Sequence, residues 1–218
     1  MKVVISLGGS LLSLEDLDYI KRVAHLIKKL SEEHKLYVVV GGGRIARNYI
    51  RAARNFCQDE KYLDKIGITA TRLNALLLNS FFMNEIPETI ERAAKMDAPV
   101  IMGGTTPGHS TDAVAATLAA ETGANRLIIA TDVDGVYDKD PKKYRDARKF
   151  DTIHISKLRE MAGEEWKDAG KNVVIDPIAC RIIEKSRMET VVVNGKNLEE
   201  LEKAIYGKKF KGTVVEVK

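Results

Sequence analysis

Short apolar runs alternate along the chain with longer amphipathic segments. Val3–Leu7 and Leu36–Val40 are continuous apolar runs that stop at glycines, a pattern typical of buried parallel strands. From Leu17 to Leu30 the apolar residues recur at helical spacing with lysine and glutamate between them, which predicts an amphipathic helix. By the same criteria we predict further strands at Pro99–Met102, Arg126–Ala130, Thr190–Val193 and Thr213–Val217. We predict further helices at Ile45–Ala53, Ile66–Phe82, Ile90–Lys95, Asp112–Thr122, Ser156–Met161, Asp176–Ser186 and Leu198–Ile205.

Strands separated by helices imply βαβ crossovers and therefore a mainly parallel sheet. The predicted fold class is α/β, a three-layer αβα sandwich around an open sheet. We find no linker, repeat or low-complexity segment, so residues 1–218 are expected to form a single domain with two lobes that meet near residue 125. The strongly apolar segment Ile66–Phe82 is expected to serve as core or, with a slight preference, as a subunit interface.

Composition narrows the class of protein. The 218 residues are 44% hydrophobic and 30% charged, as in an ordinary globular protein. No apolar run approaches the length that spans a bilayer, and the first run is too short for a signal peptide, so we expect a cytoplasmic protein without a membrane partner. A formal charge of +4 is too small to indicate nucleic-acid binding. Cys57 and Cys180 lack neighbouring ligands, so neither a disulfide framework nor a zinc site is expected.

Glycines follow three of the predicted strands, as Gly8-Gly9-Ser10, Gly41-Gly42-Gly43 and Gly103-Gly104-Thr105. Ligands of open parallel sheets bind at the carboxyl ends of the strands. Glycine at that edge lets backbone N–H groups approach an anion, and a following helix adds its dipole. Three such turns at one edge predict a phosphate-binding site.

Two common phosphate motifs explain this pattern poorly. The sequence contains no G-x-x-x-x-G-K-[ST], so a P-loop enzyme is excluded. Gly41–Ala46 satisfies G-x-G-x-x-G/A, but a dinucleotide-binding site also needs an acidic residue about 20 positions later, at the end of the next strand. Asp59, Glu60 and Asp64 lie beside helical segments instead, which leaves this alternative weak.

Four segments together resemble the amino acid kinase family, and within it the archaeal-type uridylate (UMP) kinases. They are Val4–Ser10, Val39–Arg47, Gly103–Asp112 and Thr131–Tyr137, in the family's order and spacing. The resemblance covers essentially the whole chain. It implies ATP with Mg²⁺ as the phosphoryl donor, UMP as the acceptor and a homohexamer built from dimers. Isopentenyl phosphate kinases, acetylglutamate kinases and aspartokinases differ from this chain in the same motifs.

The resemblance also implies roles for single residues near the phosphates. Gly9 and Ser10 match the cradle of the donor phosphates, Gly42 faces UMP and Gly43 faces ATP. Arg47, one turn into the next helix, matches a phosphate-binding arginine, and we expect it to be the catalytic cation.

The two nucleosides are expected to lie on either side of these phosphates. Asp64 matches a carboxylate that binds the UMP ribose, which suits an acceptor of two hydroxyl donors. The resemblance implies that one loop wraps UMP, with His109 contacting or covering the base; its residues are Thr105, Thr106, Pro107, Gly108, His109, Ser110 and Thr111. The adenosine side of the ATP site is matched by Thr131, Tyr137 and Asp140.

One departure from the family leaves the catalytic charge open. Many members carry lysine two residues before the first glycine pair, where this chain has Ser6. The archaeal uridylate kinases also tend to lack this lysine, so its loss does not argue against the function. Besides Arg47, the cations that could replace it are Arg44, Lys2 and Lys171. Asp132 falls where some relatives place a carboxylate that orients active-site lysines, and its role, like the Mg²⁺ ligands, stays open. Two alternatives remain: another small-molecule kinase of the family, or a non-catalytic nucleotide or oxyanion binder on the same fold, as in molybdenum-storage proteins.

Overall fold

One mixed sheet organises the part of the chain that the computed structural model describes, residues 1–163 and 175–217. Its strand order is β3-β2-β1-β4-β6-β7-β5, and all neighbours are parallel except β6 and β7. The strands are β1 (Lys2–Leu7), β2 (Lys35–Val40), β3 (Val100–Met102), β4 (Arg126–Thr131), β5 (Thr152–His154), β6 (Thr190–Asn194) and β7 (Gly212–Glu216). The helices are α1 (Leu17–Ser31), α2 (Gly43–Ala53), α3 (Glu60–Asn79), α4 (Ile90–Lys95), α5 (Thr111–Thr122), α6 (Ile155–Ala162), α7 (Pro177–Ser186) and α8 (Leu198–Tyr206).

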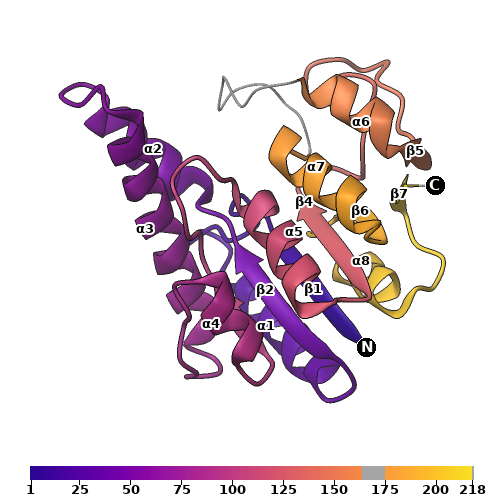
Figure 1. Cartoon of the computed structure of the whole chain (residues 1–218), viewed down its shortest axis with the longest axis horizontal. Helices are drawn as coiled ribbons and strands as arrows, with labels where there is room; N and C mark the ends of the chain where they lie inside the picture. The colour runs from indigo at the N-terminus through magenta and orange to yellow at the C-terminus, as the bar shows by residue number, and fades with distance from the viewer. Residues whose placement is uncertain (164–174, 218) are drawn as a thin grey trace.

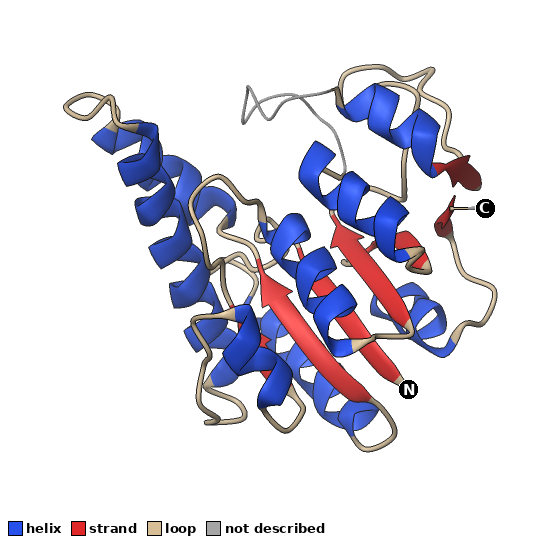
Figure 2. Cartoon of the chain, in the orientation of Figure 1, coloured by secondary structure: helices blue, strands red, loops and turns tan. Residues whose placement is uncertain are grey.

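Helices cover both faces of the sheet, as the alternation of strands and helices predicts (Figures 1 and 2). Side chains of α1 and α8 pack against one face, and those of α5 and α7 pack against the other. The central strands β1 and β2 are buried along almost their whole length because both faces are covered. The predicted α/β three-layer architecture is confirmed.

Two elements differ from the sequence-based prediction. β5 was not predicted, because a three-residue strand with alternating exposure at the edge of a sheet has too little hydrophobic pattern to identify it. α3 begins at Glu60, six residues before the predicted start at Ile66, and ends at Asn79 rather than Phe82. The apolar run identifies the part of α3 that packs against the rest of the protein. The start of the helix is set instead by its N-cap residue, Asp59.

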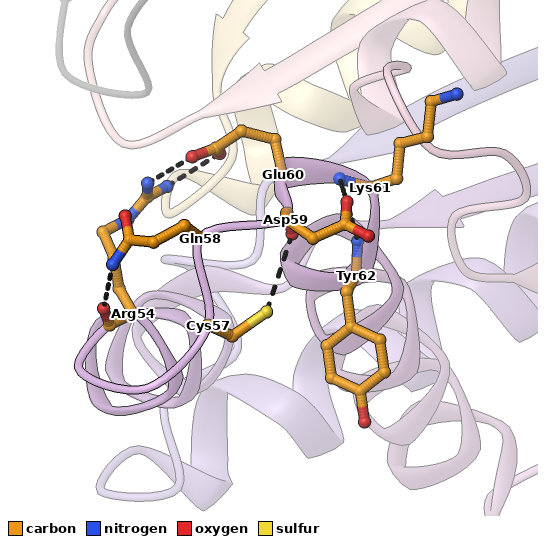
Figure 3. A network of polar contacts seen from close by, with 7 residues as sticks. All are labelled: Arg54, Cys57, Gln58, Asp59, Glu60, Lys61 and Tyr62. Atoms are coloured by element: carbon orange, nitrogen blue, oxygen red, sulfur yellow. Dashed lines mark hydrogen bonds and ion pairs between the residues drawn. The ribbon is translucent and has the colours of Figure 1, made fainter.

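Polar contacts close the loop between α2 and α3 (Figure 3). The carboxylate of Asp59 accepts hydrogen bonds from the backbone N–H groups of Lys61 and Tyr62, at 2.9 and 3.3 Å, and thereby caps α3. The guanidinium of Arg54 at the end of α2 forms a bidentate ion pair with Glu60. These contacts turn the chain so that α2 and α3 project together from the sheet (Figure 1).

Among the described residues, no helix is both long and apolar enough to cross a membrane. Cys57 and Cys180 are both free thiols, and Cys180 is buried. Burial raises the pKa of Cys180 to about 12, which makes this thiol a core residue and not a nucleophile.

Candidate active site

The first two glycine turns interlock, backbone against backbone, at the carboxyl ends of β1 and β2. A Cβ atom added to Gly9 would lie 2.2 Å from the nitrogen of Gly43 and 2.4 Å from the carbonyl oxygen of Gly41. Gly43 has a φ of +56°, and a Cβ atom there would lie 2.1 Å from the carbonyl oxygen of Gly9. Only glycine permits this approach. The turns therefore form one continuous backbone surface, and the N-terminus of α2, with its positive dipole end, begins on it.

Two polar side chains of α3 hold the second and third glycine turns. The buried amide of Asn74 donates hydrogen bonds to the carbonyl oxygens of Gly41 (2.8 Å) and Gly42 (3.2 Å). The hydroxyl of Thr71 accepts a hydrogen bond from the N–H of Gly104 at 2.6 Å. Neither residue was predicted to belong to the site, because Ile66–Phe82 was predicted only as an apolar helix. The available signal was two polar residues three positions apart within an otherwise apolar helix face.

Asp64 of α3 is tied to the loop expected to bind the acceptor. Its Oδ2 accepts a hydrogen bond of 2.7 Å from the N–H of Gly108, which has a φ of +83°. The carboxylate and this loop, far apart in sequence, are therefore brought together as the resemblance implies. Along the loop, Thr106, Gly108 and His109 are exposed, whereas Thr105, Pro107, Ser110 and Thr111 are half-buried.

Ser110 already has structural partners. Its hydroxyl accepts a hydrogen bond of 3.1 Å from the N–H of Ala113 and caps α5. The same hydroxyl donates to the carboxylate of Asp176, which itself caps α7. The N-termini of α5 and α7 are therefore linked directly behind the loop.

A partly buried carboxylate lies beneath the first glycine turn. Ser6 of β1 donates a hydrogen bond of 2.5 Å to Oδ1 of Asp112, which is in the first turn of α5. Burial raises the pKa of Asp112 to about 7; the Ser6 hydrogen bond lowers it, and the charge of Asp176 raises it further. Ser6, at the position where many family members carry lysine, is therefore buried, with its hydroxyl engaged by Asp112.

The titration of Asp112 makes stability depend on pH. Its pKa in the folded protein, about 7, lies above its ordinary value of 3.8, so the folded state binds the proton more tightly than the unfolded state. The free energy of unfolding should therefore fall as pH rises from about 4 to about 7. In Asp112→Asn, which keeps the acceptor for Ser6 but does not titrate, this part of the fall should disappear. Urea unfolding of both proteins at pH 5 and pH 8 measures it, and parallel profiles would contradict the assignment.

The expected adenosine side lies beyond β4. The N–H of Gly8 donates a hydrogen bond of 2.9 Å to the carbonyl oxygen of Ala130, so the end of β4 borders the first glycine turn. Thr131 ends β4, and Tyr137 is half-buried in the loop that follows. Burial, followed by the charge of Asp134, raises the pKa of Tyr137. Asp140 accepts a hydrogen bond of 2.9 Å from the N–H of Lys142 and so also shapes its own turn.

The candidate cations differ in where the fold places them. Lys2 is at the amino end of β1, where its ammonium donates to the carbonyl oxygen of Thr122 at 2.8 Å. It is at the opposite edge from the glycine turns and is excluded as the missing cation. Arg44 forms an ion pair of 2.6 Å with Glu15. Arg47 is exposed on α2, and its guanidinium forms no hydrogen bond or ion pair with any residue the structure describes. Lys171 lies outside the described residues.

The described residues contain no cluster of side chains typical of a protein metal site. Within residues 1–163 and 175–217 no group of three or more histidine, cysteine, aspartate or glutamate residues is arranged to hold a metal ion.

The fold and the linked glycine turns define an αβα protein with close-packed backbone turns at the carboxyl edge of its sheet, and comparison with known proteins identifies the family. Residues 1–194 match the amino acid kinase family, and the chain belongs to it. It is 43% identical over 226 residues to a uridylate kinase of Thermococcus kodakarensis, covering 99% of this chain and 100% of that one. The uridylate kinase of Archaeoglobus fulgidus is 44% identical, and its crystal structure superimposes with a TM-score of 0.87, covering 99% of this chain and 100% of the other. The UMP kinase of Ureaplasma parvum is 26% identical, with a TM-score of 0.77 and coverage of 99% and 98%.

Proposed function

We propose that this protein is a nucleoside monophosphate kinase that transfers the γ-phosphoryl group of ATP to UMP, giving UDP and ADP. The observation that carries the proposal is the full-length similarity, at 43% and 44% identity, to curated uridylate kinases. The interlocked turns after β1 and β2 support it, because they bring the backbone of both turns together at the edge where the two reacting phosphates are proposed to meet.

The acceptor is proposed to lie between α3 and the loop from Thr105 to Thr111. Asp64 would accept from the ribose hydroxyls with the carboxylate oxygen that Gly108 does not use. Gly42 would offer its backbone to the UMP phosphate. In this arrangement the hydrogen bond between Asp64 and Gly108 would position the loop before UMP binds.

The donor is proposed to lie over the first glycine turn, with Gly9, Ser10 and Gly43 around its phosphates. Thr131, Tyr137 and Asp140 would contact the adenosine. On this reading the chain divides into an acceptor lobe of about residues 1–125 and a donor lobe of about residues 126–218.

The reaction needs alignment and charge neutralisation more than acid–base chemistry. The attacking phosphate oxygen of UMP is already anionic, so no side chain has to remove a proton from it. Backbone N–H groups of the glycine turns and the guanidinium of Arg47 would stabilise negative charge on the transferring group. The proposed reaction therefore needs no catalytic triad, and none of the residues above is assigned as a nucleophile or a general base.

Mg²⁺ is proposed to accompany ATP. In kinase sites this ion is held largely by the phosphates and water, with few protein ligands, and the exposed hydroxyl of Ser10 fits as an oxygen donor. When bound, it would neutralise the donor phosphates.

The enzyme is proposed to act in the cytoplasm. Its proposed assembly is a homohexamer built from dimers. Apolar side chains on α2 and α3 support the assembly, because Tyr49, Tyr62, Leu73 and Leu76 are all more than half exposed in the single chain. These helices project from the sheet (Figure 1), so a second subunit could cover them. Light scattering at micromolar concentration tests the assembly, and a monomer would contradict it.

A coupled assay for ADP formation tests the function. With ATP and Mg²⁺, UMP should be phosphorylated far faster than AMP or GMP. Equal turnover of the three would refute the uridylate assignment and favour a kinase of broader acceptor range. No ADP with any acceptor, together with tight ATP binding, would favour the non-catalytic binder.

A further inference from the structure

A lysine outside the matched motifs reaches the carboxyl edge of the sheet. The ammonium nitrogen of Lys142 lies 2.5 Å from Oδ2 of Asp132, and the two residues are ten positions apart. Asp132 directly follows the last residue of β4, whereas Lys142 is near the middle of the loop that leaves this strand. The loop therefore folds back so that its lysine returns to the strand end.

Hydrogen bonds within the loop hold it in this folded-back conformation. Its base is closed by backbone hydrogen bonds from Asp138 to Arg148 (3.1 Å) and from Phe150 to Val136 (2.9 Å). The side chain of Asp138 adds a hydrogen bond of 2.8 Å from the N–H of Arg148. Within the loop, the Asp140 carboxylate accepts from the N–H of Lys142 and fixes the turn from which the lysine extends.

The strand end that Lys142 reaches adjoins the first glycine turn. A Cβ atom added to Gly8 would lie 3.0 Å from the carbonyl oxygen of Ala130 and 3.8 Å from the Cα of Thr131. β1 and β4 are neighbouring strands, so a cation at the end of β4 is beside the turn that follows Ser6. Ser6 itself is buried and bonded to Asp112, so β1 contributes no positive charge there.

The Lys142–Asp132 contact is not explained by stability. The lysine side chain is 59% exposed, and exposed ion pairs contribute little to folding. An ammonium has three donors, and Asp132 engages one of them, which leaves donors for an anion. Lys139 of the same loop provides a contrast, since its ammonium pairs at the same distance of 2.5 Å with Asp146 and not with the strand end.

We propose that Lys142 contacts the transferring phosphoryl group of the donor and that Asp132 positions it there. The inference rests on the proposed function and adds a second cation, besides Arg47, beside a first strand that carries Ser6 in place of lysine. As the acceptor oxygen bonds to phosphorus, the bond from phosphorus to the bridging oxygen breaks and ADP leaves with the electron pair. Lys142 donates a hydrogen bond to the oxygens on which this charge develops, and no proton has to be transferred. Arg47 approaches the same group from α2, on the other side of the first glycine turn.

Steady-state kinetics with matched variants test the proposal. Lys142→Gln should lower kcat with UMP and ATP by about 100-fold, with a much smaller change in either KM. Lys142→Arg should restore part of the activity. Lys139→Gln, which removes a charge from the same loop, should stay within about threefold of wild type. Melting curves and circular dichroism establish that each variant is folded.

The positioning role of Asp132 is tested by a double-mutant cycle. Asp132→Asn should lower kcat, and combining it with Lys142→Gln should cause little further loss, because both changes remove the same positioned charge. A wild-type protein that forms no ADP from ATP and UMP would overturn the proposed function. An active wild-type protein with Lys142→Gln as active as Lys139→Gln, or with additive losses in the double variant, would overturn this inference alone.

Discussion

Replacing Arg47 with alanine is expected to lower kcat by at least about 100-fold, the largest effect of any single change considered. Arg47 is one turn into α2, whose N-terminus begins on the interlocked glycine turns, and its guanidinium has no partner among the described residues. An arginine that stabilises the charge of a transferring phosphoryl group contributes on the order of 10³–10⁵ in kcat. Initial rates with UMP and ATP both varied give kcat and the two KM values separately.

Two further variants test whether the effect depends on the guanidinium group and on its position along α2. Arg47→Lys should recover activity only in part, because lysine is a point charge without the planar, bidentate geometry of guanidinium. Arg51→Ala removes an exposed arginine one turn further along α2 and should leave kcat close to wild type. Near-normal kcat with a raised KM in Arg47→Ala would reduce Arg47 to a residue that binds ground-state phosphate.

Replacing Asp64 with asparagine is expected to raise the KM for UMP by about 10- to 150-fold, with a much smaller change in the KM for ATP. Loss of a hydrogen bond to a charged group costs roughly 1.5–3 kcal/mol, which corresponds to that range. Asparagine retains one carbonyl oxygen that can accept from the N–H of Gly108, so the loop tether of 2.7 Å survives the change. KM values from the coupled assay, with each nucleotide varied in turn, provide the measurement.

The matched control for Asp64 is Glu60→Gln, at the first residue of the same helix. Glu60 is exposed and pairs with Arg54, so its removal should leave both KM values close to wild type. If Asp64→Asn raised the KM for ATP as much as that for UMP, the carboxylate would have been assigned to the wrong substrate.

Local pattern was sufficient to predict most of the elements. β1, β2 and β4 were predicted to within one residue at each end, because strands buried on both faces form unbroken apolar runs, and in β1 and β2 these runs end at glycine. α4 was predicted over its whole length, Ile90–Lys95, and alternation of strands with helices predicted the parallel sheet. The three glycine turns, taken together, also predicted which edge of the sheet would bind phosphate.

The contacts within the site could not be predicted in this way, because they join residues far apart in the chain. Asn74 reaches Gly41 only because α3 packs beside the turn after β2, and no periodicity encodes that pairing. Asp64 and Gly108 are 44 positions apart, and only the resemblance placed them at one substrate.

Sequence alone therefore determined the layers and the family and predicted the edge at which phosphate is proposed to bind, since each depends on local periodicity or on contiguous motifs. Tertiary structure decided which charges face that edge. It places Lys2 at the opposite end of β1, buries Ser6 against Asp112, and returns Lys142 to Asp132 at the end of β4. The physical reason is that the direction of a side chain at a strand end depends on which strand and which loop become its neighbours, and packing of the whole sheet settles that choice.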